Sequence, residues 1–197
     1  MTDRQVPPNV FQASYAGEPP WDTGRPQPDL VALADRVRGS VLDAGCGTGE
    51  HALFYAARGH EAWGLDAVPA AIEKARAKAA ARGLSATFLV GDALALDRLA
   101  RRFDHVLDSG LFHVFSDADR TRYVEALTTV LAPGGTLHLL CFSQLTPGDF
   151  GPRRVTQAEI RAAFALGWTV RELAAASFET NVEGRQPRAW RAVIERM

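Results

Sequence analysis

Three alternating glycines follow an apolar run in the stretch VLDAGCGTGE, residues 41–50. Gly45, Gly47 and Gly49 let the backbone turn sharply and approach a ligand without Cβ atoms in the way. A dinucleotide-binding loop, G-x-G-x-x-G, would have its third glycine at position 50, where this chain has Glu50. A carboxylate at the start of the following helix would oppose a pyrophosphate. The loop therefore favours a positively charged ligand without phosphates, and it disfavours an NAD-dependent oxidoreductase.

Acidic residues stand at the ends of three successive apolar stretches: Asp43, Asp66 and Asp92. Asp66 lies about 20 residues beyond the glycines, the spacing at which a carboxylate can accept hydrogen bonds from ribose hydroxyls. Asp92 can accept a hydrogen bond from the exocyclic amine of a purine. Together with Asp43, these residues predict a site for an adenosine that carries a cationic group. The alternative is that the three carboxylates cap helices or turns.

The elements that must position these residues alternate between strand and helix. This alternation predicts an α/β protein with a mostly parallel sheet that is covered on both faces and binds ligands beyond the carboxyl ends of its strands. Helical character is expected over residues 29–39. Later helix starts are marked by Pro69, by Ser116 and by a capping box at Thr156. The expected strands lie near residues 41–44, 61–65, 86–90, 103–108, 135–142, 168–175 and 188–195.

The motifs VLDAGCGTGE, GLD, VGDA and PGGTLHLLCF, in this order and spacing, resemble those of class I S-adenosylmethionine-dependent methyltransferases. The resemblance covers roughly residues 40–197. It implies a Rossmann-like, doubly wound, seven-stranded sheet that is mostly parallel, with the last strand antiparallel and helices on both faces. It also implies S-adenosylmethionine as the cofactor, S-adenosylhomocysteine as the product, and no metal.

The same resemblance assigns roles to residues of the cofactor site. Gly45 and Gly47 would face the methionine end of the cofactor, and Asp43 would orient its ammonium group. Asp66 would take the ribose, and Asp92 would take the adenine together with the Ala93 amide. Further cofactor contacts are expected from Trp21, Arg25, Cys46, Ala67, Gly91, Asp108 and Ser109.

The N-terminal stretch PPWDTGRPQP, residues 19–28, resembles a small-molecule branch that includes thiopurine, thiol, halide and heterocyclic-toxin methyltransferases. Trp21, held in a proline-braced turn, could offer a flat wall to the sulfonium or to a planar acceptor. The alternative is that Trp21 only plugs the open end of the core. We expect residues 1–40 to form a lid or cap packed on a methyltransferase core of residues 41–197, within a single domain.

The resemblance also implies that the loop after the fourth expected strand, DSGLFHVF, would lie beside the transferable methyl group. His113 is the candidate catalytic base because the pKa of a free imidazole suits proton transfer near neutral pH. The alternative for His113 is a structural hydrogen bond to nearby backbone. Acceptor contacts are expected from Tyr15, Trp21, Phe112, His113, Phe115 and Phe142.

These observations favour O- or N-methylation of a planar aromatic or heterocyclic small molecule. A thiol- or halide-methylating enzyme and a non-catalytic S-adenosylmethionine-binding protein stay open as alternatives. The net charge of −1 gives no reason to expect a nucleic-acid partner, and no apolar run is long enough for a membrane span. The two cysteines fit a reducing, cytoplasmic location, and no signal peptide is apparent. A monomer or homodimer is expected.

Overall fold

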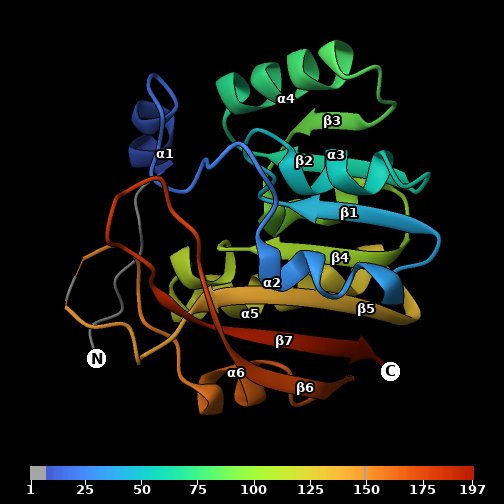
Figure 1. Ribbon diagram of the computed structural model, residues 1–197. Helices are drawn as coiled ribbons and strands as arrows, with labels where there is room; N and C mark the ends of the chain where they lie inside the picture. Colours follow the sequence, from blue (N-terminus) through green and yellow to red (C-terminus); the bar gives the residue numbers. More distant parts are fainter. Residues whose placement is uncertain (1–7, 149) are drawn as a thin grey trace.

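One sheet forms the centre of the molecule in a computed structural model that describes residues 8–148 and 150–197 (Figure 1). Its seven strands lie in the order β3-β2-β1-β4-β5-β7-β6. β1 to β5 are parallel, whereas β7 runs antiparallel to its neighbours β5 and β6. The predicted fold, with its antiparallel last strand, is confirmed. The strands are β1 (Ser40–Ala44), β2 (Glu61–Asp66), β3 (Thr87–Val90), β4 (Phe103–Ser109), β5 (Leu131–Phe142), β6 (Trp168–Ser177) and β7 (Arg188–Arg196).

The strand order reverses between β1 and β4, which are neighbours in the sheet but distant in sequence. Ala44, at the end of β1, pairs with Leu65 of β2 on one side and with Asp108 of β4 on the other. Connections that leave such a switch point in opposite directions open a crevice beyond the strand ends. The glycine loop and the loop after β4 therefore start side by side.

Hydrophobic residues of β1 alternate between two cores because successive side chains point to opposite faces of a strand. Val41 belongs to the cluster that contains Leu53 and Ile72. Leu42 belongs to the opposite cluster, which contains Tyr123. Figure 1 shows α3 in front of the sheet and α5 behind it, so helices cover both faces. The helices of the core are α3 (Glu50–Ala56), α4 (Pro69–Ala81), α5 (Asp117–Val130) and α6 (Gln157–Ala163), with 3-10 turns η2 (Ala93–Leu99) and η3 (Phe112–Val114).

Predicted helix signals are found at the starts of α5 and α6. The Ser116 side chain accepts a hydrogen bond from Asp119 N at 3.1 Å, and Thr156 and Glu159 form a capping box. The helical character expected over residues 29–39 is divided between α2 (Pro28–Val31) and η1 (Ala34–Arg36). Strand β1 begins shortly after η1, which leaves no room for a longer helix.

The N-terminal segment, by which we mean residues 8–28, contacts two distant parts of the chain, the β6–β7 loop and helix α3. It starts with the short helix α1 (Pro8–Ser14). The backbone N–H of Asn181, in the β6–β7 loop, donates to Pro20 O at 3.0 Å, and the backbone N–H of Gln27 donates to His51 Nε2 at 3.0 Å. Within the described ranges, no helix is long and apolar enough to cross a membrane.

Candidate functional site

The glycine loop, residues 45–49, adopts backbone conformations that glycine takes up far more readily than other residues. The φ angle is 70° at Gly45, 53° at Gly47 and 86° at Gly49. A Cβ atom at Gly47 would lie 2.6 Å from the hydroxyl oxygen of Tyr15. Position 47 therefore requires glycine both for its backbone conformation and for the close approach of the N-terminal segment.

Asp43 lies at the base of this loop with only 1% of its surface exposed. Its Oδ2 accepts a hydrogen bond from Ala52 N at 3.3 Å. Burial, together with the nearby carboxylates of Asp66 and Asp108, raises the pKa of the Asp43 carboxyl to about 7. A buried carboxyl stabilised by one long hydrogen bond suits a cationic ligand, since an ammonium group would supply both positive charge and further hydrogen bonds. The residues at this point therefore fit the methionine end of S-adenosylmethionine.

Asp66 joins the glycine loop to the end of β2. Its Oδ2 accepts from Gly47 N at 2.8 Å and its Oδ1 accepts from Val68 N at 2.9 Å. Burial raises the pKa of its carboxyl. Each carboxylate oxygen has a second lone pair, so these turn contacts leave room for ribose hydroxyls. A structural role and a ligand role are therefore compatible at Asp66.

Replacing Asp66 by alanine should weaken S-adenosylhomocysteine binding at least tenfold. Two ribose hydroxyls would lose a charged acceptor, and hydrogen bonds to charged groups contribute about 1.5–3 kcal/mol. The Asp66→Asn variant is the matched comparison, because its amide oxygen keeps one acceptor for the Gly47 or Val68 N–H. Titration calorimetry on both variants measures the effect. An unchanged dissociation constant in Asp66→Ala would show that the ribose binds elsewhere.

Asp92 is exposed and caps η2, accepting from Leu94 N at 2.9 Å. This is the capping geometry that the sequence left open as an alternative, and the adenine contact stays a prediction. Ala93 is buried beside it. A pocket of about 250 Å³ lies along this strand end, lined by Gly91 and Asp92 together with Leu65, Leu89, Val90, Ala95, Arg98 and Leu99.

Glu50 does not repel an anionic ligand, and this part of the sequence argument was wrong. Its side chain is 8% exposed and forms ion pairs with Lys78 at 2.7 Å and with Arg82 at 2.8 Å. Burial raises the pKa of the Glu50 carboxyl, but Lys78 of α4 and Arg82, which directly follows that helix, hold it below its usual value. Two positive charges neutralise the carboxylate, so Glu50 says little about the charge of the ligand.

Asp108 organises the loop after β4. Its Oδ1 accepts from Leu111 N at 2.8 Å, and its Oδ2 accepts from Phe112 N at 3.1 Å. It is completely buried, and burial raises the pKa of its carboxyl to about 6. The side chain therefore shapes the loop from within the protein, while Ser109 beside it is half-buried. A cofactor contact from either residue stays a prediction.

Phe112 and Phe115 are buried in the core, and an acceptor contact by either ring stays a prediction. Phe112 is 1% exposed and packs on Phe164 with ring centroids 5.9 Å apart. Phe115 packs on Tyr123 of α5 at 5.1 Å. Phe112 in the 3-10 turn and Phe115 directly after it both belong to the main core cluster, where burying their apolar surface is favourable.

His113 forms the structural hydrogen bond that was its alternative role. Its Nδ1 accepts from Phe142 N at 3.0 Å. Burial and the positive charges of Arg120 and Arg154 lower the pKa of the imidazole to about 3. Because Nδ1 accepts, the hydrogen of the neutral ring is on Nε2, which can donate but cannot take up a proton. This geometry favours orientation over general-base catalysis, and a base role for His113 stays a prediction.

Three rings at the end of β5 pack together and are called the aromatic wall below: His113 and Phe178, each 6% exposed, and Phe142, which is half-buried. The ring centroids lie 4.8 Å apart for His113 and Phe142, 5.2 Å for Phe142 and Phe178, and 5.8 Å for His113 and Phe178. Sequence analysis predicted Phe142 and missed Phe178. The available signal was its position shortly after the sixth expected strand, residues 168–175, whose end lies at the same edge of the sheet.

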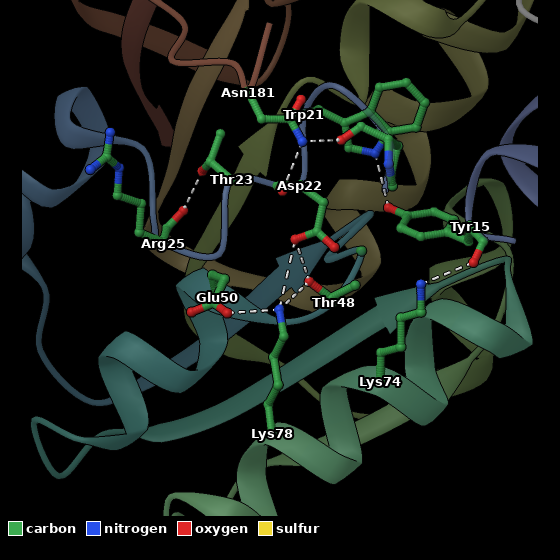
Figure 2. A network of polar contacts seen from close by, with 12 residues as sticks. Tyr15, Trp21, Asp22, Thr23, Arg25, Thr48, Glu50, Lys74, Lys78 and Asn181 are labelled. Carbon is green, nitrogen blue, oxygen red and sulfur yellow. Dashed lines mark hydrogen bonds and ion pairs between the residues drawn. The ribbon is translucent and has the colours of Figure 1, made fainter. Parts of the chain in front are cut away.

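Tyr15 and Trp21 meet above the glycine loop (Figure 2). The indole Nε1 of Trp21 donates to the Tyr15 hydroxyl at 3.0 Å. Trp21 packs edge-on against Phe11, with centroids 5.8 Å apart, yet 42% of its surface remains exposed. An indole this exposed is not a plug of the core.

Other predicted cofactor residues have contacts of their own. The Arg25 guanidinium is 67% exposed and pairs with Glu179 of the β6–β7 loop at 2.8 Å, which ties the N-terminal segment to that loop. The Cys46 thiol is buried and donates to Gly47 O at 3.6 Å. Ala67 is exposed at the end of β2. Cofactor contacts by these three residues stay predictions.

Fold and site define the class of protein as a Rossmann-like α/β protein with a glycine loop at the sheet's switch point. The methyltransferase domain family matches residues 41–135. The chain is also 39% identical over 191 residues to 2-heptyl-1-hydroxyquinolin-4(1H)-one methyltransferase of Mycobacteroides abscessus, over 90% of this chain and 84% of that relative. The chain therefore belongs to the class I S-adenosylmethionine-dependent methyltransferases, and it is a small-molecule enzyme of that family.

The chain is also similar to a further named relative and to a solved structure. It is 31% identical over 132 residues to probable thiol methyltransferase 2 of Arabidopsis thaliana, over 64% of this chain and 58% of that relative. A structure solved in a study of the conversion of a disulfide bond into a thioacetal group during echinomycin biosynthesis superposes with a TM-score of 0.84 at 39% identity. That match covers 95% of this chain and 92% of the solved chain.

Proposed function

We propose that this enzyme methylates an oxygen or nitrogen atom of a planar aromatic or heterocyclic compound, with hydroxyquinolones as the favoured class. The observation that carries the proposal is the aromatic wall beside the loop after β4, in which buried His113 and Phe178 pack against Phe142, the ring that stays half-buried. Flat rings of this kind stack on planar acceptors. The relative from Mycobacteroides abscessus, named for a hydroxyquinolone, supports the same class.

Residues 1–40 are proposed to act as a lid on the core of residues 41–197. Support comes from the described part, where the Tyr15 hydroxyl lies against Gly47 and Lys74 Nζ donates to Tyr15 O at 3.0 Å. The β6–β7 loop holds the same segment from the opposite side. A lid in this position would exclude water from the methyl group and order the acceptor.

Positioning supplies most of the proposed catalysis. S-adenosylmethionine, when bound, supplies an electrophilic methyl group on a cationic sulfur atom. Asp43 would hold the ammonium group, Asp66 the ribose, and Trp21 would close over the glycine loop. The aromatic wall would hold the acceptor in line with the methyl group, and alignment of this kind can contribute about 7–11 kcal/mol. His113 would orient the acceptor by donating from Nε2.

Methylation of a thiol or halide is the second candidate, favoured by the thiol methyltransferase relative. A panel of hydroxyquinolones, phenols, thiols and iodide separates the two under identical conditions. We expect kcat/KM to be highest for a hydroxyquinolone. A higher value for thiols or iodide would reject the proposed acceptor class, and absence of any turnover alongside S-adenosylhomocysteine binding would favour a non-catalytic binding protein.

Replacing Trp21 by alanine should reduce turnover or cofactor affinity far more than it reduces stability. Truncating a buried aromatic costs about 3–5 kcal/mol, but Trp21 is 42% exposed and should cost less. Trp21→Phe is the matched control, because it keeps a flat ring and loses only the hydrogen bond to Tyr15. Thermal melting and steady-state kinetics test the pair. A large fall in melting temperature with unchanged kinetics would show that Trp21 serves packing alone.

A further inference from the structure

Charged side chains gather where the N-terminal segment crosses the glycine loop (Figure 2). The Lys78 ammonium lies 2.7 Å from Glu50 Oε1, and it donates to Thr48 Oγ1 at 2.6 Å. Asp22 Oδ1 lies 3.7 Å from the same ammonium. Arg82 pairs with the remaining oxygen of Glu50. Two carboxylates and two cations are thus combined, and one carboxylate, Asp22, comes from the N-terminal segment.

Asp22 is held from two sides. Thr48 Oγ1, within the glycine loop, donates to Asp22 Oδ1 at 2.7 Å. On the other side, Asn181 Nδ2 donates to Pro19 O at 3.1 Å and approaches Asp22 O at 3.5 Å. These contacts fix the residues on both sides of Trp21, and therefore the position of the indole.

We infer that Lys78 is a positioning residue, which acts through Thr48 and Asp22 to hold the N-terminal segment closed over the cofactor. This inference rests on the lid proposed above. Lys78 uses its hydrogens on Thr48 and Glu50, so the Thr48 hydroxyl must direct its own hydrogen to Asp22. When the segment opens and Asp22 moves away, the Glu50 carboxylate alone faces the two cations Lys78 and Arg82. The excess positive charge then attracts the Asp22 carboxylate back to the closed position.

The strength of this contact suits a lid that opens in every cycle. The side chains of Lys78 and Asp22 are 27% and 17% exposed, so solvent screens their attraction in part. Opening is required because the Tyr15 hydroxyl lies against Gly47 when the segment is closed. A partly screened contact can hold the ligand and still release product.

The inference is tested by a double-mutant cycle of Asp22→Ala, Lys78→Met and the two together. The dissociation rate of S-adenosylhomocysteine from the full chain is measured by stopped flow. Each single change should speed dissociation about tenfold, the scale of a lost charge-assisted hydrogen bond. The double variant should be no faster than either single variant, because both act through one contact. Lys78→Arg should retain a slow rate.

Arg171→Met is the matched control, since it removes one cation of an ion pair, with Glu195, on β6. It should leave dissociation unchanged. Additive effects of Asp22→Ala and Lys78→Met, or rates equal to that of the unaltered protein, would overturn the inference.

Hydrogen exchange on the ligand-free chain keeps this test separate from the proposed function. The Asp22 amide, which donates to Pro19 O at 3.0 Å, should exchange faster in Lys78→Met. If the Asp22 amide exchanges at the same rate in Lys78→Met and in the unaltered protein, and the two proteins have equal melting temperatures, the inference is overturned. Failure of the unaltered protein to bind S-adenosylhomocysteine would instead count against the proposed cofactor site.

Discussion

Removing residues 1–28 is expected to abolish methyl transfer while leaving the sheet folded. Every strand begins at Ser40 or later, and the two largest core clusters contain no residue before Ala34. The truncation removes Tyr15 and Trp21, which lie over the glycine loop. Without them, water would reach the methyl group and the acceptor would lose its cover. Thermal melting and methyl transfer, measured on the same preparation, test both halves of this expectation.

The truncated protein should still melt cooperatively, although it loses the small cluster of Tyr15 with Val68 and Ala71. Its melting temperature is compared with that of Trp21→Ala, which keeps the backbone of the segment. Full activity after truncation would refute the lid. Loss of cooperative melting would show that the segment belongs to the core.

Replacing Asp43 by asparagine should weaken S-adenosylhomocysteine binding by roughly 30-fold or more. Breaking one partner of a buried charge pair costs about 2–5 kcal/mol, and Asp43 is 1% exposed. Asparagine preserves the volume and an acceptor for Ala52 N, so the change isolates the charge. Calorimetric titration at pH 8 gives the affinity. An unaltered affinity would mean that the ammonium group binds away from Asp43.

The same variant should be more stable than the unaltered protein without ligand. The folded carboxyl has a pKa of about 7, against 3.8 for the ordinary carboxyl, so the folded state holds the proton more tightly. Stability of the unaltered protein is therefore lost as pH rises from about 4 to 7. The melting temperature of Asp43→Asn should exceed that of the unaltered protein at pH 8, with the gap narrowing toward pH 4. A constant gap would contradict the raised pKa.

Most of the site residues that could be predicted from the sequence lie at the ends of strands. Asp43, Asp66 and Asp108 follow or end apolar runs, and parallel pairing places such ends at one edge of the sheet. The capping box at Thr156 is a local signal and could be read from residue types alone. These features depend on short-range pattern and on one topological rule.

Side-chain direction within loops could not be predicted in this way. Phe112 and Phe115 sit in one short turn, and spacing does not say whether their rings face the core or the ligand. Phe178 meets His113 and Phe142 in a sheet where β7 lies between β5 and β6, which is a non-local arrangement. Glu50 was misread for a similar reason, since its partners are distant in sequence: Lys78 lies on the next helix and Arg82 directly after it.

Transfer of labelled methyl from S-adenosylmethionine to a 2-alkyl-1-hydroxyquinolin-4-one tests the central claim most directly. The account predicts label on an oxygen or nitrogen of the quinolone, with one S-adenosylhomocysteine formed for each methyl transferred. Asp43→Asn should lose this transfer, and Arg171→Met should keep it. Label that appears only on thiols or iodide, or S-adenosylhomocysteine binding without transfer to any acceptor, would contradict the account.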